Sequence, residues 1–391
     1  MPRVHVIGGS IGGLTAALVL RDAGCDVHVY ERSDADLVGR GAGIVVHPMT
    51  VRYFAENNVL ELDRISVPSR TLRYINSDGT VAYEEQVNYR LTAWNTLYRA
   101  LRACLEPDRY HLGQTMRGFE QAKERVLVRF ASGQEEECDL LVCADGVAST
   151  ARGLLFPDVK PLYAGYVGWR GTVPESCLMP ATVNDLGASI TYHLTPNSHI
   201  LAYAIPAADG SVTAGHRLLN FVWYRNVSEG QELQELMTDR SGVRHDTSLP
   251  PGAVPQRYIR QLRQAAVDLP ESLKNAVLKC PEPFIQAIVD LEVPWMVDRR
   301  VCLIGDAAFT ARPHAAAGTA KACADAWALA DAVRAAKGDV VRALREWEPG
   351  QLTLGRQLVE RARLMGNRSQ FYGTWRPEDR SLRFGLWEPG R

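Results

Sequence analysis

The feature that most restricts the fold of this chain is a glycine-rich turn between a strand pattern and a helix pattern near its start. The strand pattern over Val4 to Ile7 is followed by Gly8-Gly9-Ser10-Ile11-Gly12-Gly13. A helical pattern then runs from Ile11 to Ala23, ends at Gly24 and leads into a second apolar run over Val27 to Tyr30. Strand, turn, helix and strand in this order form a βαβ unit, which builds a parallel sheet.

The turn has the spacing of a dinucleotide-binding loop. Such a loop lets the backbone approach a pyrophosphate at a helix N-terminus, and an acidic residue roughly 20 positions further on binds ribose hydroxyls. Glu31 ends the second strand 23 positions after Gly8, and Ser10 takes the place of the middle glycine. We therefore expect Gly8, Ser10, Ile11, Gly13 and Glu31 to contact a dinucleotide. The alternative is an ordinary glycine-rich turn.

A second motif distinguishes between the two common dinucleotides. The apolar strand over Arg300 to Ile304 ends in Gly305-Asp306, and a helix pattern follows from Gly318 to Arg334. A carboxylate at the end of a strand can accept hydrogen bonds from a polyol, which FAD carries in its ribityl chain and NAD lacks. The positive end of the helix also stabilises the negative charge of a reduced flavin. The two motifs together predict FAD.

A third motif, Asp145-Gly146, follows the apolar run from Asp139 to Ala144. The glycine-rich loop, the Asp-Gly motif and the Gly-Asp motif occur in this order, at about these separations, in the FAD-dependent aromatic hydroxylases. The chain resembles this family over nearly its whole length. The family consists of single-component flavoprotein monooxygenases with the p-hydroxybenzoate hydroxylase fold.

The segment between the Asp145-Gly146 motif and the Gly305-Asp306 motif has a different residue pattern from the rest of the chain. From Tyr163 to Asn226, aromatic and β-branched residues partly alternate with polar ones between Pro, Gly and Asn turns, which is typical of antiparallel strands. We expect an α/β (overall α+β) fold, in which a Rossmann-like FAD-binding domain contains an inserted, mostly antiparallel β-sheet substrate domain. The expected FAD-binding parts are 1–72, 96–162 and 280–345, the substrate-domain parts are 73–95 and 163–279, and a C-terminal helical segment covers 346–391.

The resemblance implies roles for individual residues. Glu31 and Arg32 would hold the adenosine ribose, and Asp306 the ribityl or pyrophosphate region. Asp145 is associated in the family with both FAD and NAD(P)H binding. The stretch 313–318 would lie against the isoalloxazine ring. The other expected cofactor contacts are Gly43, Gly305, Pro313, Gly318, Thr319 and Ala320.

The reaction follows from the same resemblance. FAD would be bound tightly and non-covalently, and because the sequence has a single complete dinucleotide loop, NADH or NADPH would visit transiently as the electron donor. Reduced FAD and O2 would give a C4a-hydroperoxide that hydroxylates a small hydroxylated aromatic or hydroxypyridine ring. The protein would position the ring and exclude water, which otherwise releases hydrogen peroxide.

A hydroxylated ring reacts faster as its anion, so we expect a base or proton-relay group near the ring hydroxyl. His314, beside Pro313, is the first candidate because its reference pKa of about 6.5 suits proton transfer near neutrality. His47, after the loop 41–46, and Tyr203, on an expected substrate-domain strand, are weaker candidates. The alternative for His314 is a surface or helix-capping histidine, and the alternative for Tyr203 is an aromatic core residue. Trp223 and Tyr224 are adjacent in one strand, so only one of them can face the substrate.

Composition bears on which partners, metal sites and cellular compartments we expect for this protein. The 44 Lys and Arg nearly balance the 45 Asp and Glu, so we expect no nucleic-acid partner. No pair among the 8 cysteines has C-x-x-C spacing, so we expect no metal site and free thiols in a reducing compartment. With no membrane-length apolar run and no signal-peptide pattern, we expect a cytoplasmic protein without membrane contact. A homodimer is expected from family habit alone.

Two other functions stay open from the sequence. The first is a flavin dehydrogenase or oxidase on the same scaffold, or a relative that oxygenates a non-aromatic metabolite. The second is a flavin- or NAD-binding protein without catalytic activity, which no residue pattern favours.

Overall fold

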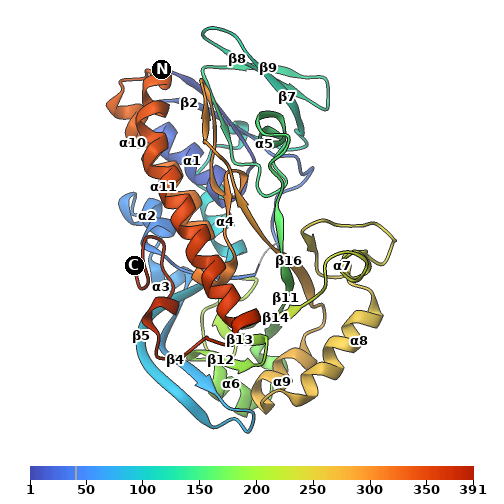
Figure 1. Ribbon diagram of the computed structural model, residues 1–391. Helices are drawn as coiled ribbons and strands as arrows, with labels where there is room; N and C mark the ends of the chain where they lie inside the picture. Colours follow the sequence, from blue (N-terminus) through green and yellow to red (C-terminus); the bar gives the residue numbers. More distant parts are fainter. Residues whose placement is uncertain (40–41) are drawn as a thin grey trace.

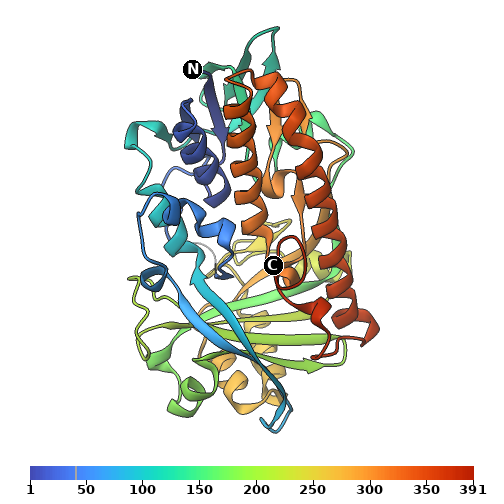
Figure 2. The same cartoon turned by 90° about the vertical axis from the view of Figure 1, so that its left-hand side faces the viewer.

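Two large sheets and a pair of long helices organise the chain. The computed structural model describes residues 1–39 and 42–391; position 41, the first residue of the loop before His47, lies outside them. The parallel sheet and the long helices occupy one half of the molecule, and a broad antiparallel sheet occupies the other (Figures 1 and 2).

The parallel sheet carries the glycine-rich turn. Its strand order is β17-β18-β10-β1-β2-β6, and every pairing is parallel except that of β17 with β18. The strands are β1 (Arg3–Ile7), β2 (Asp26–Tyr30), β6 (Tyr110–His111), β10 (Leu140–Cys143), β17 (Val297–Asp298) and β18 (Val301–Leu303). All four residues of β10 are buried, as expected for a parallel strand covered on both faces. The turns after β1, β10 and β18 therefore lie at one edge of the sheet.

The second sheet has ten strands and is almost entirely antiparallel. Its path is β15-β16-β11-β14-β13-β12-β4-β5-β3, with β19 paired to β16, and among the pairings of the described residues only that of β12 with β4 is parallel. The strands are β3 (Gly43–Val45), β4 (Val67–Ile75), β5 (Val81–Ala93), β11 (Leu162–Pro174), β12 (Ser189–Thr195), β13 (Ser198–Ile205), β14 (Leu218–Asn226), β15 (Ser248–Leu249), β16 (Phe284–Glu292) and β19 (Phe309–Thr310). A small third sheet contains β7 (Met116–Gln121), β8 (Val126–Phe130) and β9 (Glu135–Cys138).

Helices cover both sheets. The two longest, α10 (Gly318–Ala335) and α11 (Val340–Asn367), lie side by side along the molecule (Figure 2). The others are α1 (Ile11–Asp22), α2 (Pro48–Glu56), α3 (Leu62–Ile65), α4 (Trp94–Arg102), α5 (Thr150–Leu155), α6 (Pro180–Leu186), α7 (Gln231–Leu236), α8 (Gln256–Ala265) and α9 (Glu271–Lys279). Among the described residues, no helix is both long enough and apolar enough to cross a membrane.

The expected fold class is confirmed, but sheet membership departs from the expected segment limits. The predicted first FAD-binding part, 1–72, contains β3 and most of β4, and the part 280–345 contains β16 and β19. These strands belong to the ten-stranded sheet. Alternation of apolar and polar residues identifies a strand, but the partner of that strand is set by contacts distant in sequence. The large sheet is therefore assembled from more pieces of the chain than we expected.

A buried ion pair fixes α10 against the end of β18. The Lys321 ammonium lies 2.7 Å from Oδ2 of Asp325, one turn along the helix, and both side chains are almost completely buried. The same carboxylate oxygen accepts a hydrogen bond of 2.8 Å from the backbone N–H of Gly305. Burial raises the pKa of Asp325, and the charge of Lys321 opposes that shift. The pair therefore connects the long helix to the Gly-Asp turn.

We predict that Lys321→Met lowers the free energy of unfolding by about 3–5 kcal/mol, because it leaves a buried carboxylate without its cation. Urea titration followed by circular dichroism measures the change. Arg334→Met on the same helix is the matched control, since its partner Asp331 is exposed and such pairs contribute less than about 1 kcal/mol. Equal stability of the two variants would contradict this role for the buried pair.

Candidate active site

One large cavity lies where the parallel sheet meets the ten-stranded sheet. Its volume is about 1020 Å³, at the upper end of the range for small-molecule sites. One part of the lining consists of residues expected to hold a cofactor: Arg32, Gly43, Asp306, Pro313, Gly318 and Thr319. The other part comes mainly from strands of the large sheet: Arg170, Tyr192, His199, Leu201, Tyr203, Val222, Tyr224 and Gln286.

The glycine-rich turn is built for close backbone packing. Gly8 has φ +101°, in the region that favours glycine, and a Cβ there would lie 2.3 Å from the Ala144 carbonyl oxygen. A Cβ on Gly13 would lie 1.8 Å from the carbonyl oxygen of Gly8. None of the residues 8–13 lines the cavity. Ser10 precedes α1 but makes no capping hydrogen bond with its side chain, so the N–H groups of the first turn remain available to an anion.

Glu31 holds the turn from the end of the neighbouring strand. Its buried carboxylate accepts hydrogen bonds of 2.9 Å from the backbone N–H groups of Gly9 and Ser33. The arrangement fixes the carboxylate beside the glycine-rich loop, where the ribose of a dinucleotide would lie. Arg32 is exposed and lines the cavity.

The Gly-Asp motif lies next to the start of α1. Gly305 has φ +60°, and Cβ atoms on Gly305 and Gly12 would lie 3.0 Å and 2.9 Å from the Cβ of Ala322 in α10. Both turns thus approach one residue of the long helix. The following Asp306 is exposed to the cavity.

These residues fit FAD. Helices α1 and α10 both lack an acidic residue in the first turn and a side-chain cap, so both present free N–H groups and a positive dipole end. An exposed carboxylate, Asp306, and an exposed guanidinium, Arg32, line the same cavity. The donor set suits a pyrophosphate, a ribityl chain and a reduced flavin ring.

The opposite wall of the cavity follows the register of three strands. In β13 and β14, His199 pairs with Tyr224, and Leu201 pairs with Val222. Val222 in turn pairs with Arg170 of β11. All five side chains line the cavity. Cross-strand partners point to the same face of a sheet, so the pairing itself groups these side chains into one wall.

His314 lies in the cavity lining beside Pro313 and is buried. Its Nε2 lies 2.7 Å from the hydroxyl oxygen of Tyr166. A Cβ on Gly366 of α11 would lie 3.0 Å from the Cδ2 and Nε2 edge of the ring, so Nδ1 is on the side away from that helix. Nδ1 has no hydrogen-bond partner among the described residues. Burial, with His199 and Arg312 nearby, holds the pKa of His314 well below its usual value, so the ring is neutral near pH 7. The expectation of a pKa near neutrality is therefore wrong, and any proton that His314 handles would pass through a neutral ring.

The other two catalytic candidates differ in position. Tyr203 lines the cavity, where burial raises its pKa to about 12, and its ring packs against Gly43. His47 precedes α2 and does not line the cavity; burial lowers its pKa to about 4. Tyr224 lines the cavity, whereas Trp223 packs on the other face of the sheet, as expected for neighbours in a strand.

Asp145 and Ala320 are also placed outside the cavity. Asp145 accepts hydrogen bonds of 2.8 Å and 3.2 Å from the backbone N–H groups of Thr150 and Ala151, at the start of α5. Ala320 is buried in the first turn of α10, directly after the cavity-lining Thr319. In this structure, therefore, Asp145 holds a helix terminus.

Sequence reasoning missed much of the aromatic lining. His199 and Leu201 share a face with Tyr203 at a spacing of two, and this alternation was a usable signal. Trp375 and Phe384 also line the cavity, from the irregular end of the chain. No periodic pattern predicts those two contacts.

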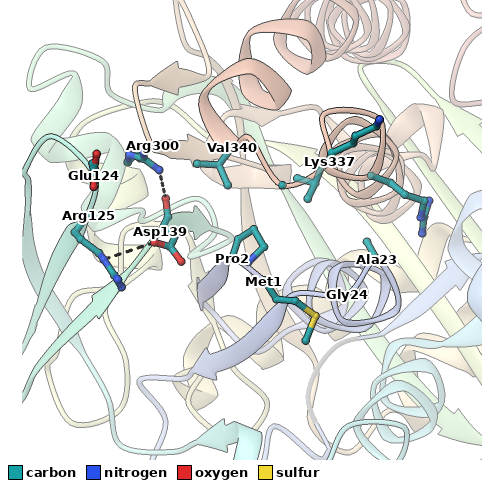
Figure 3. Close-up of a pocket in the computed structure, with 13 residues that line it drawn as sticks. Met1, Pro2, Ala23, Gly24, Glu124, Arg125, Asp139, Arg300, Lys337 and Val340 are labelled. Carbon is teal, nitrogen blue, oxygen red and sulfur yellow. Dashed lines mark hydrogen bonds and ion pairs between the residues drawn. The ribbon is translucent and has the colours of Figure 1, made fainter.

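A second hollow, of about 630 Å³, lies at the opposite edge of the parallel sheet, around Met1 and Pro2 (Figure 3). Basic side chains surround it, and two of them contact Asp139: Arg125 lies 3.7 Å from its carboxylate, and Arg300 donates to its backbone carbonyl over 3.2 Å. Ligands of open α/β sheets bind at the carboxyl ends of the strands. This hollow adjoins the amino ends, so the larger cavity is the candidate site.

Comparison with known proteins agrees with this geometry. Residues 6–58 match a family model described as an NAD(P)-binding Rossmann-like domain, and residues 163–290 match one described as FAD binding domain-like. The first match covers the glycine-rich turn and Glu31. The second covers most of the cavity-facing strands.

Relatives cover nearly the whole chain. The chain is 41% identical to 2,6-dihydroxypyridine 3-monooxygenase of Paenarthrobacter nicotinovorans, over 98% of this chain and 96% of that protein. It is 28% identical to 3-amino-4-hydroxybenzoate 2-monooxygenase of Streptomyces cremeus, over 92% and 86%. The solved structure of 2,6-dihydroxypyridine-3-hydroxylase from Arthrobacter nicotinovorans matches with a TM-score of 0.94 and 40% identity, over 99% of this chain and 98% of that chain. The chain therefore belongs to the FAD-dependent aromatic hydroxylases, the flavoprotein monooxygenases of the p-hydroxybenzoate hydroxylase fold.

Proposed function

We propose that this monooxygenase hydroxylates a small hydroxypyridine or a related hydroxylated aromatic ring, with NADH or NADPH as a transient electron donor. The observation that carries the proposal is the position of His314, which follows the expected flavin-facing residue Pro313 and contacts the rings of His199 and Tyr224. These two rings, with Tyr192 and Tyr203, are here called the aromatic wall. The similarity to a 2,6-dihydroxypyridine 3-monooxygenase supports the pyridine ring as the preferred class. A homodimer in the cytoplasm remains a prediction.

Different residues of the chain would bind the cofactor, bind the substrate ring and handle the proton. When bound, FAD takes electrons from NAD(P)H and activates O2 for transfer of one oxygen atom to the ring. Glu31, Arg32 and Asp306 would hold the cofactor. The aromatic wall would bind the ring face and exclude water. Nδ1 of His314 would hold or move the proton of a ring hydroxyl.

A panel of hydroxypyridines and phenols tests the proposal. A hydroxypyridine should stimulate NAD(P)H oxidation under air, with oxygen consumed and a product heavier by one oxygen atom in mass spectrometry. Reduction of the flavin by the ring without NAD(P)H would indicate a dehydrogenase instead. Absence of stimulation by every ring in the panel would contradict ring hydroxylation.

We predict that Asp306→Ala weakens FAD binding by about 10- to 100-fold, because it removes a charge-assisted hydrogen bond worth roughly 1.5–3 kcal/mol. The ratio of absorbance at ~450 nm to that at 280 nm, measured after incubation with a series of FAD concentrations and removal of unbound FAD by rapid gel filtration, compares the FAD bound by the two proteins. Asp331→Ala, an exposed carboxylate on α10, is the control and should bind FAD like the wild type. Full flavin content in Asp306→Ala would remove Asp306 from the cofactor site.

We predict that His314→Gln slows hydroxylation by about 10²- to 10⁴-fold, the usual contribution of a general acid or base, and increases hydrogen peroxide release. FAD content should not change. His193→Gln is the control, since His193 is also buried, but its Nδ1–H donates to the backbone carbonyl of Ile75 over 2.8 Å, outside the cavity. If product per NAD(P)H stays at the wild-type value in His314→Gln, His314 does not handle the proton.

A further inference from the structure

The last residues of the chain form a strap across the ten-stranded sheet. Helix α11 continues into a short π-helix, Arg368–Tyr372, and Gly373, with φ +60°, lets the chain leave the helix. Residues 374–391, here called the C-terminal strap, then run beside the end of α11 and along β5 (Figures 1 and 2). Apart from one short turn over Arg380–Leu382, the strap is irregular.

The strap supplies two aromatic side chains to the cavity. Trp375 and Phe384 both line it and are 5% and 6% exposed. The indole of Trp375 stacks on the ring of His199, with centroids 5.2 Å apart and planes at 30°. The ring of Phe384 lies 5.2 Å from that of Tyr89 in β5. Removing the strap would therefore open the cavity on the side of the aromatic wall.

Side chains, rather than a strand ladder, hold the strap in place. Trp375 Nε1 donates to the hydroxyl of Tyr74 over 3.2 Å, and Arg383 forms an ion pair of 2.5 Å with Glu85 of β5. Among the described residues, two backbone-to-backbone hydrogen bonds join the strap to the rest of the chain: Thr374 donates to the Arg368 carbonyl over 3.0 Å, and Gly385 donates to the Ala315 carbonyl over 3.1 Å. A segment with so few backbone bonds opens at a lower free energy than the sheet beneath it.

The backbone bond from Gly385 to Ala315 reaches the loop that carries the candidate base. Ala315 directly follows His314, so the position of the strap and the position of the His314 backbone are linked. The side chain of Trp375 also approaches the His314 ring, with centroids 6.3 Å apart. Displacement of the strap would thus alter both the wall of the cavity and the surroundings of the proton-handling residue.

We propose that the C-terminal strap is the ring-selecting wall of the substrate cavity, in which Trp375 limits the size of the ring and the Arg383–Glu85 pair keeps Trp375 in place. The proposal rests on the proposed ring hydroxylation. A closed wall keeps water from the reacting centre, and loss of an indole leaves a space that a larger ring or water can fill. The strap therefore controls both which ring reacts and how much reduced cofactor is lost as hydrogen peroxide.

Trp375→Ala tests the size limit, and Trp387→Ala is the matched control because Trp387 is 52% exposed on the same strap. In Trp375→Ala, product per NAD(P)H should fall at least threefold with a hydroxypyridine, while kcat/KM for a bicyclic hydroxyquinoline should rise at least tenfold. FAD content should equal that of the wild type. Unchanged ring preference and unchanged product per NAD(P)H in Trp375→Ala would overturn the proposal.

Limited trypsin digestion tests the Glu85 contact without relying on activity. Glu85→Gln should speed cleavage after Arg380 and Arg383 at least threefold, whereas Glu84→Gln, which changes the neighbouring carboxylate paired with Arg73, should not. A hydroxypyridine should slow cleavage of the wild type. Equal rates in both variants and no protection by the ring would overturn the proposal. Ring protection together with no hydroxylation of any ring would instead contradict the proposed function alone.

Discussion

The hydrogen bond from the Gly305 backbone N–H to Asp325 is the contact on which the cofactor-facing part of the structure depends. It fixes the turn after β18 against α10, while Lys321 neutralises the carboxylate inside the core. Because α10 begins at the cavity and Asp306 follows Gly305, one buried contact aligns a carboxylate with a helix N-terminus. Ala322 then brings the start of α1 to the same place, since both Gly12 and Gly305 approach it closely.

The chemistry of the substrate-facing part of the site, which contains His199 and His314, depends on the exclusion of water. His199 and His314 are both buried, and burial lowers the pKa of His199 to about 3 and that of His314 well below its usual value. Both rings are therefore neutral at pH 7 and can exchange hydrogen bonds with a ring hydroxyl without adding a positive charge to a wall that already contains Arg170. The wall itself comes from strand pairing in the large sheet and is completed by Trp375 and Phe384.

The parts of the site in which the local backbone conformation requires a particular residue type could be predicted from the sequence. The glycine-rich turn and the Gly305-Asp306 turn require glycine at particular φ values or close approaches, and these requirements appear directly as residue types. The aromatic wall was only partly predictable: Tyr203 was placed on a substrate-domain strand, but its neighbours are set by the register between β13 and β14. Trp375 reaches the cavity through tertiary contacts of an irregular segment, for which sequence periodicity carries no signal.

A crystal structure of the FAD-loaded enzyme with a hydroxypyridine, prepared without NAD(P)H so that no turnover occurs, tests the central claim most directly. The account predicts the ring between His314 and the aromatic wall, with a ring hydroxyl oxygen about 2.6–3.2 Å from Nδ1 of His314 and Trp375 closing the space beside it. A ring bound elsewhere, or bound in this cavity with no polar contact to His314, would contradict it.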